Sequence, residues 1–166
     1  MVAELLGDIE QYCAGESLEV ILTLNLPEVL PFSANEYFFP LKIISNRLPM
    51  GFGENHNQAF GQAGGDFFCV LNPDIRIQEK YIQPLIQAMN ESDPHRTRCA
   101  QVIDPNGKVE DSARKFPAPG EIFGKVFGYS SRRCPQGSGH IMYPDWVAGM
   151  FMLFPASVYR ENRRVR

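Results

Sequence analysis

Three short apolar runs constrain the fold of this 166-residue chain more than any other feature of its sequence. They are LEVILTL at residues 18–24, FPLKIIS at 39–45 and FFCVLN at 67–72. Each is nearly continuous in apolar and β-branched residues, which is typical of a strand covered on both faces. Because predicted helices alternate with these runs, we expect an α/β fold with a mostly parallel central sheet flanked by helices.

The predicted helices come from apolar spacing and from stop signals. Leu5, Leu6 and Ile9 recur at helical spacing, so the chain is expected to open on an amphipathic helix. A second helix is expected over Glu54–Ala63, before a Gly-Gly stop. A third covers residues 77–92, with Pro84 as a kink or a boundary.

The second half of the chain predicts further strands. CAQVIDPNGKVEDSA, residues 99–113, reads as a strand, a Pro-Asn-Gly turn and a short return strand. WVAGMFMLF, residues 146–154, predicts the last buried strand. The basic tail from Tyr159 onward is expected to be solvated and frayed, with a phosphate-binding role as the minor alternative.

Polar residues follow the predicted strands where a ligand site would form. Asn25, Asn46 and the triplet Asn72-Pro73-Asp74 each come directly after an apolar run. In open parallel sheets, ligands gather at the carboxyl ends of the strands, so these residues predict a polar rim. Each has an alternative interpretation as a turn residue. Trp146 is interpreted as a packing residue or as the wall of a pocket.

Several classes of function are disfavoured. The formal net charge of -3 argues against a nucleic-acid binder that works through bulk electrostatics. MGFGENHN carries His56 where a dinucleotide GxGxxG fingerprint needs glycine, so an NAD-dependent oxidoreductase is disfavoured. P-loop, GxSxG, HExxH and zinc-ligand patterns are absent from the sequence. The start of the predicted second helix could face an anion, or it could follow an ordinary loop.

The four cysteines form no CxxC pair and are expected to be reduced, although a Cys99–Cys134 disulfide stays open as an alternative. The opening residues do not resemble a signal peptide, and WVAGMFMLF is too short to cross a bilayer as a helix. We therefore expect a cytoplasmic protein, which could work as a peripheral protein at the inner face of the membrane.

Taken together, these stretches resemble the inverting family 2 glycosyltransferases, whose fold is the GT-A nucleotide-sugar-binding α/β sandwich. GFGENHNQAFGQAGGDFFCVLNPDI, residues 51–75, is similar to the central block of that family. VEDSARKFPAP and YPDWVAGMFMLF, residues 109–119 and 143–154, are similar to the bacterial rhamnosyltransferase-like branch. The resemblance implies a metal-assisted enzyme that uses dTDP-rhamnose or a UDP-sugar as donor. The implied acceptor is a glycan or a lipid-linked precursor of a surface or cell-wall polysaccharide.

The resemblance also implies roles for individual residues. Asp74 is expected to bind Mg²⁺ or Mn²⁺ on the donor diphosphate, with Asn72 in place of a second carboxylate. His56 and Asn57 match the pair near the nucleotide and the sugar. Asn25 stands where the family usually has an aspartate that bonds the base, so altered base recognition is expected. The acceptor side is expected at Asp145 and Trp146.

The chain also departs from the family pattern. The family's first strand and its C-terminal acidic motif, which supplies the general base, are not found in residues 1–166. We therefore expect a single glycosyltransferase-like domain truncated at both ends, with no catalytic base assigned. The alternative function is a catalytically inactive nucleotide-sugar-binding remnant. An incomplete sheet also leaves unpaired edges, which predicts a homodimer or strand exchange.

Overall fold

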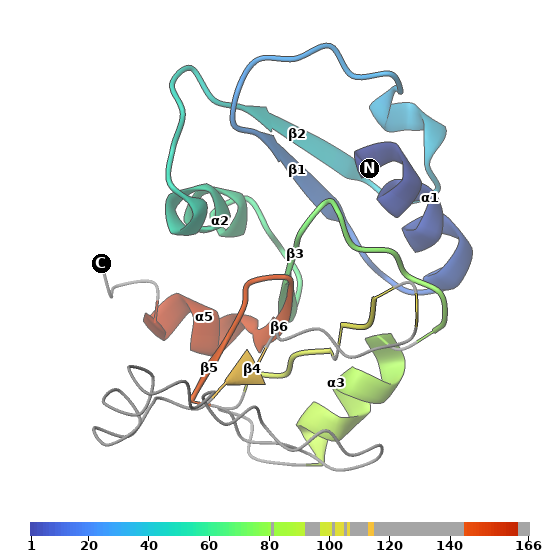
Figure 1. The fold of residues 1–166 in the computed structure, drawn as a ribbon, viewed down its shortest axis with the longest axis vertical. Helices are drawn as coiled ribbons and strands as arrows, with labels where there is room; N and C mark the ends of the chain where they lie inside the picture. Colours follow the sequence, from blue (N-terminus) through green and yellow to red (C-terminus); the bar gives the residue numbers. More distant parts are fainter. Residues whose placement is uncertain are drawn as a thin grey trace, which may run out of the picture. The chain divides into compact units, whose positions relative to one another are not determined.

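The computed structural model describes residues 1–80, 82–91, 97–100, 102–104, 106, 113–114 and 145–162. The chain divides into two units. The first contains Met1–Arg98 and Met152–Arg166, and the second contains Cys99–Phe151. The secondary-structure elements are labelled in Figure 1.

A parallel strand pair forms the frame of the first unit. β1 (Val20–Leu24) pairs with β2 (Leu41–Ser45) in parallel, with Leu22 opposite Ile43. The ladder extends at its end, where the Asn46 N–H donates to the Leu24 carbonyl at 3.0 Å. The prediction of a parallel α/β fold with flanking helices is thus confirmed.

A second sheet of the first unit contains β3 (Phe67–Leu71) and β6 (Phe151–Pro155) as hydrogen-bonded neighbours. Arg98 forms an antiparallel bridge to Leu153, with reciprocal backbone bonds of 2.9 and 2.7 Å. A strand was predicted over residues 67–72, and β3 confirms it with an end one residue earlier, at Leu71. The polar triplet therefore follows the carboxyl end of a strand.

The core lies on both sides of the parallel pair, which runs between α1 and α2 in Figure 1. One cluster is built around α1 (Val2–Tyr12), whose Leu5, Leu6 and Ile9 are buried. The predicted opening helix is therefore confirmed. Val20 of β1 packs against this cluster, whereas its neighbour Ile21 packs against the other, as alternation along a strand requires.

The other cluster joins α2 (Phe52–Phe60) to α5 (Ala156–Asn162) through aromatic side chains. The Tyr159 ring lies 4.7 Å from the rings of both Phe60 and Phe68. The tail was predicted to be solvated and frayed from Tyr159 onward. Residues 160–162 are exposed as predicted, but the fraying is wrong, because these residues belong to a last helix. The packing of the half-buried Tyr159 ring against Phe60 and Phe68 stabilises that helix.

Two element boundaries differ from the predictions. α2 begins at Phe52 instead of Glu54, so the two residues before Glu54 are helical and the loop ends at Gly51. α3 covers Ile82–Asn90 and therefore begins five residues later than predicted. Pro84 lies in its first turn, where a missing backbone N–H costs no intrahelical bond. A short 3-10 helix, η1 (Ala34–Glu36), completes the first unit.

The second unit contains an antiparallel pair, β4 (Ala113–Arg114) and β5 (Trp146–Val147). The prediction of one strand over residues 146–154 is wrong. The Met150 N–H donates to the Ala148 carbonyl at 2.8 Å, and this tight turn at Gly149 separates β5 from β6. Of the predicted strand-turn-strand over residues 99–113, the turn is seen at Asp104, whose side chain accepts from the Asn106 N–H at 2.9 Å.

The predicted burial of the strands is only partly correct. Ile43 of β2 is 42% exposed and Cys69 of β3 is also exposed, so neither strand is covered on both faces. Cys13, Cys69 and Cys99 form no disulfide with one another, whereas Cys134, and with it the Cys99–Cys134 alternative, lies outside the described residues. Among the helices that the structure describes, none is both long and apolar enough to span a bilayer.

Candidate functional site: an asparagine cluster and an exposed aspartate turn

The parallel pairing of β1 and β2 brings two predicted site residues together. Asn25 follows β1 directly and Asn46 follows β2 directly, so in-register strands end with two amides side by side. The Asn46 Nδ2 donates to the Asn25 Oδ1 at 3.0 Å. The predicted polar rim therefore exists at this edge, but its side chains bond one another.

A third asparagine, Asn55 of α2, completes what we call the asparagine cluster: Asn25, Asn46 and Asn55. The Asn46 Nδ2 donates to the Asn55 Oδ1 at 2.7 Å, and the Asn55 Nδ2 donates to the Asn25 Oδ1 at 3.1 Å. The Asn55 Nδ2 also donates to the Met50 carbonyl at 3.3 Å. The cluster thus ties both strand ends to α2 and to the loop before it.

One backbone group fixes the orientation of all three amides. The Met50 N–H can only donate, and it lies 2.8 Å from the Asn25 Oδ1. The Asn25 carbonyl oxygen must therefore face the cluster, and the amide groups of Asn46 and Asn55 must donate to it. The Asn25 Nδ2 therefore points away from these bonds. Asn25 is an exposed residue.

Asn46 is the most buried member of the cluster, at 5% exposure. Its Oδ1 atom is buried and has no hydrogen-bond partner among the residues that the structure describes. An unsatisfied buried acceptor costs free energy, which opposes the stabilisation from the two bonds donated by the Asn46 Nδ2. Asn46 therefore holds the two strand ends together.

The polar end of β3 is organised differently. The Asn72 carbonyl accepts from the Ile75 N–H at 3.4 Å, which closes a four-residue turn over Asn72–Ile75 with proline at its second position. We call these residues the β3 turn. Asn72 is half-buried, whereas Pro73 and Asp74 are exposed. Asp74 is thus a turn residue whose carboxylate is accessible to solvent.

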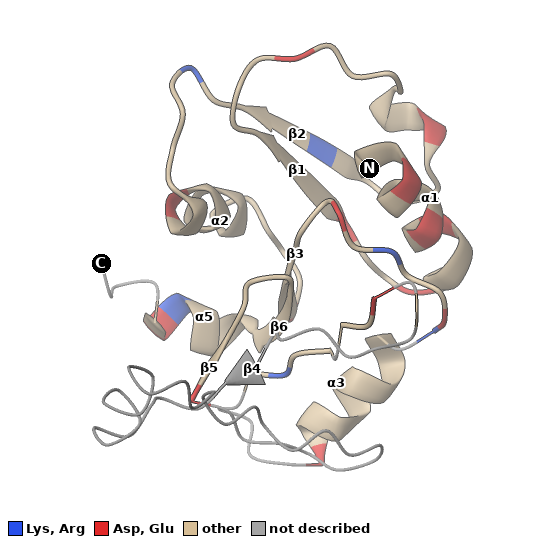
Figure 2. Ribbon diagram, viewed as in Figure 1, with Lys and Arg blue, Asp and Glu red and all other residues tan. Residues whose placement is uncertain are grey.

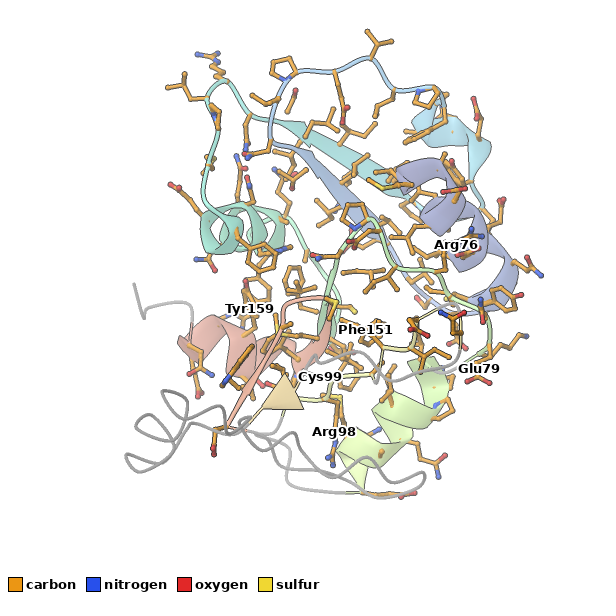
Figure 3. The ribbon with its side chains drawn as sticks, viewed as in Figure 1. Arg76, Glu79, Arg98, Cys99, Phe151 and Tyr159 are labelled. Carbon is orange, nitrogen blue, oxygen red and sulfur yellow. The ribbon has the colours of Figure 1, made fainter. Side chains whose placement is uncertain are left out.

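The chain after the β3 turn is anchored to α1 by an ion pair, and Arg76 is labelled in Figure 3. Arg76 donates to both oxygens of Asp8, from Nε at 2.6 Å and from the guanidinium nitrogen Nη2 at 2.8 Å. The Ile77 N–H donates to the same carboxylate at 3.0 Å. Figure 2 shows the acidic residues along α1. These hydrogen bonds, with that from Arg76 the strongest cause, lower the pKa of Asp8 although burial opposes them.

His56 and Asn57, the residues of α2 that were predicted to bind the sugar donor, point in different directions. Consecutive helix positions are about 100° apart, so Asn55, His56 and Asn57 cannot share one face. His56 is half-buried with its ring 4.4 Å from the Phe52 ring, and burial lowers the pKa of His56. Burial therefore favours the neutral imidazole of His56.

Asn57 faces α5. The Tyr159 hydroxyl donates to the Asn57 Oδ1 at 3.2 Å, which links two helices far apart in the sequence. Figure 3 labels Tyr159 on α5. Asn57 thus has a structural contact that the sequence did not predict, and its carbonyl oxygen is engaged in it.

The predicted acceptor-side residues belong to the second unit. Asp145 is exposed and directly precedes β5, and Trp146 is 39% exposed within β5, opposite Arg114. Of the VEDSARKFPAP stretch, only Ala113 and Arg114 lie within the described residues. Ala113 pairs with Val147 and Arg114 with Trp146, so these described residues of the two stretches lie side by side.

A divalent cation fits the β3 turn only as part of a substrate complex. No group of three or more His, Cys, Asp or Glu side chains gathers anywhere in the described part of the chain. The turn offers one exposed carboxylate, Asp74, and a neighbouring amide, Asn72. Mg²⁺ commonly binds through one or two carboxylates, retained waters and substrate phosphates, and this donor set suits that mode.

Two comparisons with known proteins bear on this site. A family model described as "Glycosyl transferase family 2" matches residues 23–154, which contain the asparagine cluster and the β3 turn. A comparison with curated proteins found no match.

Proposed function

The chain belongs to glycosyl transferase family 2, and we propose that it transfers rhamnose from dTDP-rhamnose, or another sugar from a UDP-sugar, to a glycan or lipid-linked acceptor with inversion. Membership of the family makes it a glycosyltransferase of the nucleotide-sugar type, with a donor and an acceptor. The match crosses both units, which supports treating residues 1–166 as one glycosyltransferase domain.

One observation carries the donor-site proposal. Within the matched region, Asp74 stands exposed on a turn at the carboxyl end of β3, the edge where open α/β sheets bind ligands. The nucleotide diphosphate is proposed to lie against Asn72 and Asp74. His56, Asn57 and Asn25 are the proposed contacts to the nucleotide and the sugar, and Asp145 and Trp146 those to the acceptor.

The proposed cofactor is Mg²⁺ or Mn²⁺, held by Asp74 with the donor's diphosphate. A bound cation stabilises negative charge on the leaving nucleotide diphosphate. Because the β3 turn offers one carboxylate, the cation is expected to bind weakly alone and more tightly with the nucleotide. A titration of Mn²⁺ with and without UDP measures this order, and equal Mn²⁺ affinities in both conditions would contradict the shared site.

The proposals of rhamnose as the sugar and of a polysaccharide acceptor go beyond what family membership implies. They rest on the resemblance of residues 109–119 and 143–154 to the rhamnosyltransferase-like branch. A lipid-linked acceptor would place the reaction at the cytoplasmic face of the membrane. This placement follows from the proposed acceptor class.

A donor-consumption assay tests the proposed activity. The full chain is incubated with Mn²⁺ and a panel containing dTDP-rhamnose and several UDP-sugars, and release of the nucleotide diphosphate is followed by chromatography. We expect release from one donor above background, and release that increases with a suitable glycan acceptor. Absence of release together with absence of donor binding would reject the proposal.

A second candidate function is nucleotide-sugar binding without turnover. It is favoured by one observation: α5 follows β6 directly, and its first carboxylate is Glu161 near its end. No residue is therefore assigned as the base that would deprotonate the acceptor. Donor binding without release of nucleotide diphosphate, with or without acceptor, would identify this function.

We also propose that two copies pair through a sheet edge. Among the described strands, β1 and β2 pair only with each other, so this sheet has unpaired edges within the described residues. Such edges can pair with another chain. Light scattering across a range of concentrations tests this, and a monomeric mass at the highest concentration would contradict it.

A further inference from the structure

The carboxylate of Asp8 binds one short segment of the chain, the two residues that follow the β3 turn. Asp8 is 6% exposed on α1, and its oxygens accept from Arg76 at 2.6 and 2.8 Å and from the Ile77 N–H at 3.0 Å. Burying a carboxylate costs free energy unless its charge and its hydrogen bonds are matched. All three of these bonds come from consecutive residues, so the buried charge fixes this segment against α1.

Apolar packing holds the same segment. The Ile77 side chain is 3% exposed and belongs to the core cluster around α1. Leu71, the last residue of β3, packs against that cluster as well. The β3 turn is therefore held at both ends by the packing around α1, and Asp8 adds the directional bonds at its far end.

The β3 turn has little support of its own between these two ends. It is closed by a long backbone hydrogen bond, at 3.4 Å between the Ile75 nitrogen and the Asn72 oxygen. The Asp74 carboxylate is exposed and forms no hydrogen bond or ion pair within the described part of the chain. The position of Asp74 therefore depends on how firmly the ends of the turn are held.

We propose that Asp8 is a positioning residue for the metal-bound diphosphate of the donor. Through Arg76 and Ile77 it fixes the end of the β3 turn, and this places Asp74 for the cation. The inference rests on the proposed function, because Asp74 is the proposed metal ligand. A ligand that is held in place before binding loses less conformational freedom when the cation and the diphosphate bind.

The sign of the expected effect separates positioning from simple electrostatics. Asp8→Asn removes a negative charge from the neighbourhood of an anionic nucleotide, which by charge alone should strengthen binding. The substitution also removes the charged pairing with Arg76, while the asparagine oxygen can still accept from the Ile77 N–H. Loss of positioning should therefore weaken binding, against the electrostatic trend.

The experiment is a double-mutant cycle in which calorimetry measures binding of UDP with Mn²⁺ to the full chain. The four proteins are the wild type, Asp8→Asn, Asp74→Ala and the variant with both substitutions. Asp8→Asn is expected to bind about fivefold more weakly than the wild type, less than the loss typical of a direct partner of a metal ligand. In the Asp74→Ala background the same substitution should change the affinity by less than about twofold, because the positioned ligand is already absent.

Glu19→Gln is the matched control, because Glu19 forms the same kind of bridge before the opposite end of β3. Its carboxylate lies 2.6 Å from the Lys42 Nζ and accepts from the Gly64 N–H at 2.7 Å. This variant should bind UDP with Mn²⁺ within about twofold of the wild type.

Urea denaturation shows whether each variant is folded. Where Asp8→Asn is not, Arg76→Lys takes its place in the cycle, because lysine keeps the charge but cannot bind both Asp8 oxygens in the fork that arginine provides.

The outcomes separate this inference from the proposed function. Equal or tighter binding by Asp8→Asn overturns the inference, and so does an equal loss in both backgrounds, which would show a general structural effect. A loss of the same size in Glu19→Gln overturns it as well. A wild type that does not bind UDP with Mn²⁺, or an Asp74→Ala variant that binds as the wild type does, rejects the proposed donor site, and the inference falls with it.

Discussion

Two polar strand ends of the same unit use their side chains in opposite ways. In the asparagine cluster, Asn46 is 5% exposed and donates both of its bonds to neighbouring asparagines. In the β3 turn, Asp74 is exposed and its carboxylate stands at the tip of a turn closed by backbone atoms. A polar side chain after a strand can therefore bond its neighbours and stabilise the strand end, or it can stay accessible to a bound molecule. The hydrogen bonds that the side chain makes within the protein distinguish these two roles.

Asn46→Asp should break the cluster with the largest effect on stability. An ionised carboxylate cannot donate, so the Oδ1 atoms of Asn25 and Asn55 would each face a negative charge in a buried position. We expect the free energy of unfolding to fall by about 3 kcal/mol, measured by urea denaturation.

The matched variant is Asn25→Asp, in the same cluster and with the same charge change. It keeps its accepted bonds, so the free energy of unfolding should change by less than about 1 kcal/mol. Equal losses in the two variants would show that added charge, and not the direction of the hydrogen bonds, controls the cluster.

Asp8→Asn should weaken the support of the β3 turn without touching the turn itself. Asp8 binds Arg76 and the Ile77 N–H, which follow the turn directly. Loss of the charged bonds should lower the free energy of unfolding by about 2 kcal/mol at neutral pH.

The pH dependence of the Asp8→Asn effect has a defined sign. The pKa of Asp8 is lowered in the folded protein. Its stabilisation is therefore fully present above the unfolded pKa of about 3.9 and is lost as the pH falls through the folded value. The difference between wild type and variant should shrink below about pH 4. A difference that stays constant down to pH 2 would contradict the ion pair as its source.

Gly53→Ala should have the smallest effect, and it should stabilise the protein. Gly53 lies in the first turn of α2, and an added Cβ would meet no atom within 4 Å. We expect the free energy of unfolding to rise by about 0.5 kcal/mol, because alanine is a better helix former than glycine. Gly15→Ala is the opposite control. Gly15 has φ +91°, where an alanine is strained, so this substitution should lower the free energy of unfolding by about 1 kcal/mol. Destabilisation by Gly53→Ala would reveal a packing contact at the start of α2.

The comparison also shows which parts of the site the sequence could predict. The apolar runs and the polar residues after them predicted the parallel pair, β3 and the strand ends that Asn25, Asn46 and Asn72 follow. Asn25 and Asn46 lie together at the end of the β1–β2 pair, whereas Asp74 follows β3, which belongs to another sheet. This was possible because burial and strand ends leave local signals. The turn at Asn72–Ile75 was also readable from proline and aspartate.

The partners of individual amides could not be predicted. Asn55 was not singled out because nothing local distinguishes it from Asn57, two residues later on the same helix. Which of the two reaches Asn25 depends on the rotation of α2 about its axis relative to β1. In the observed rotation Asn55 donates to Asn25 and Phe60 packs on Tyr159. The split of residues 146–154 into two strands depended on a backbone turn at Gly149, which an apolar pattern does not encode.

The most direct test of the central claim, that Asp74 holds the metal-bound diphosphate, is a calorimetric titration of Mn²⁺ with UDP into wild type, Asp74→Ala and Asp66→Ala. Asp66 is an exposed aspartate at the opposite end of β3, so it controls for lost charge. We predict that Asp74→Ala binds at least about tenfold more weakly, a loss of about 1.4 kcal/mol, while Asp66→Ala binds as wild type does. Equal affinities for wild type and Asp74→Ala would contradict the claim.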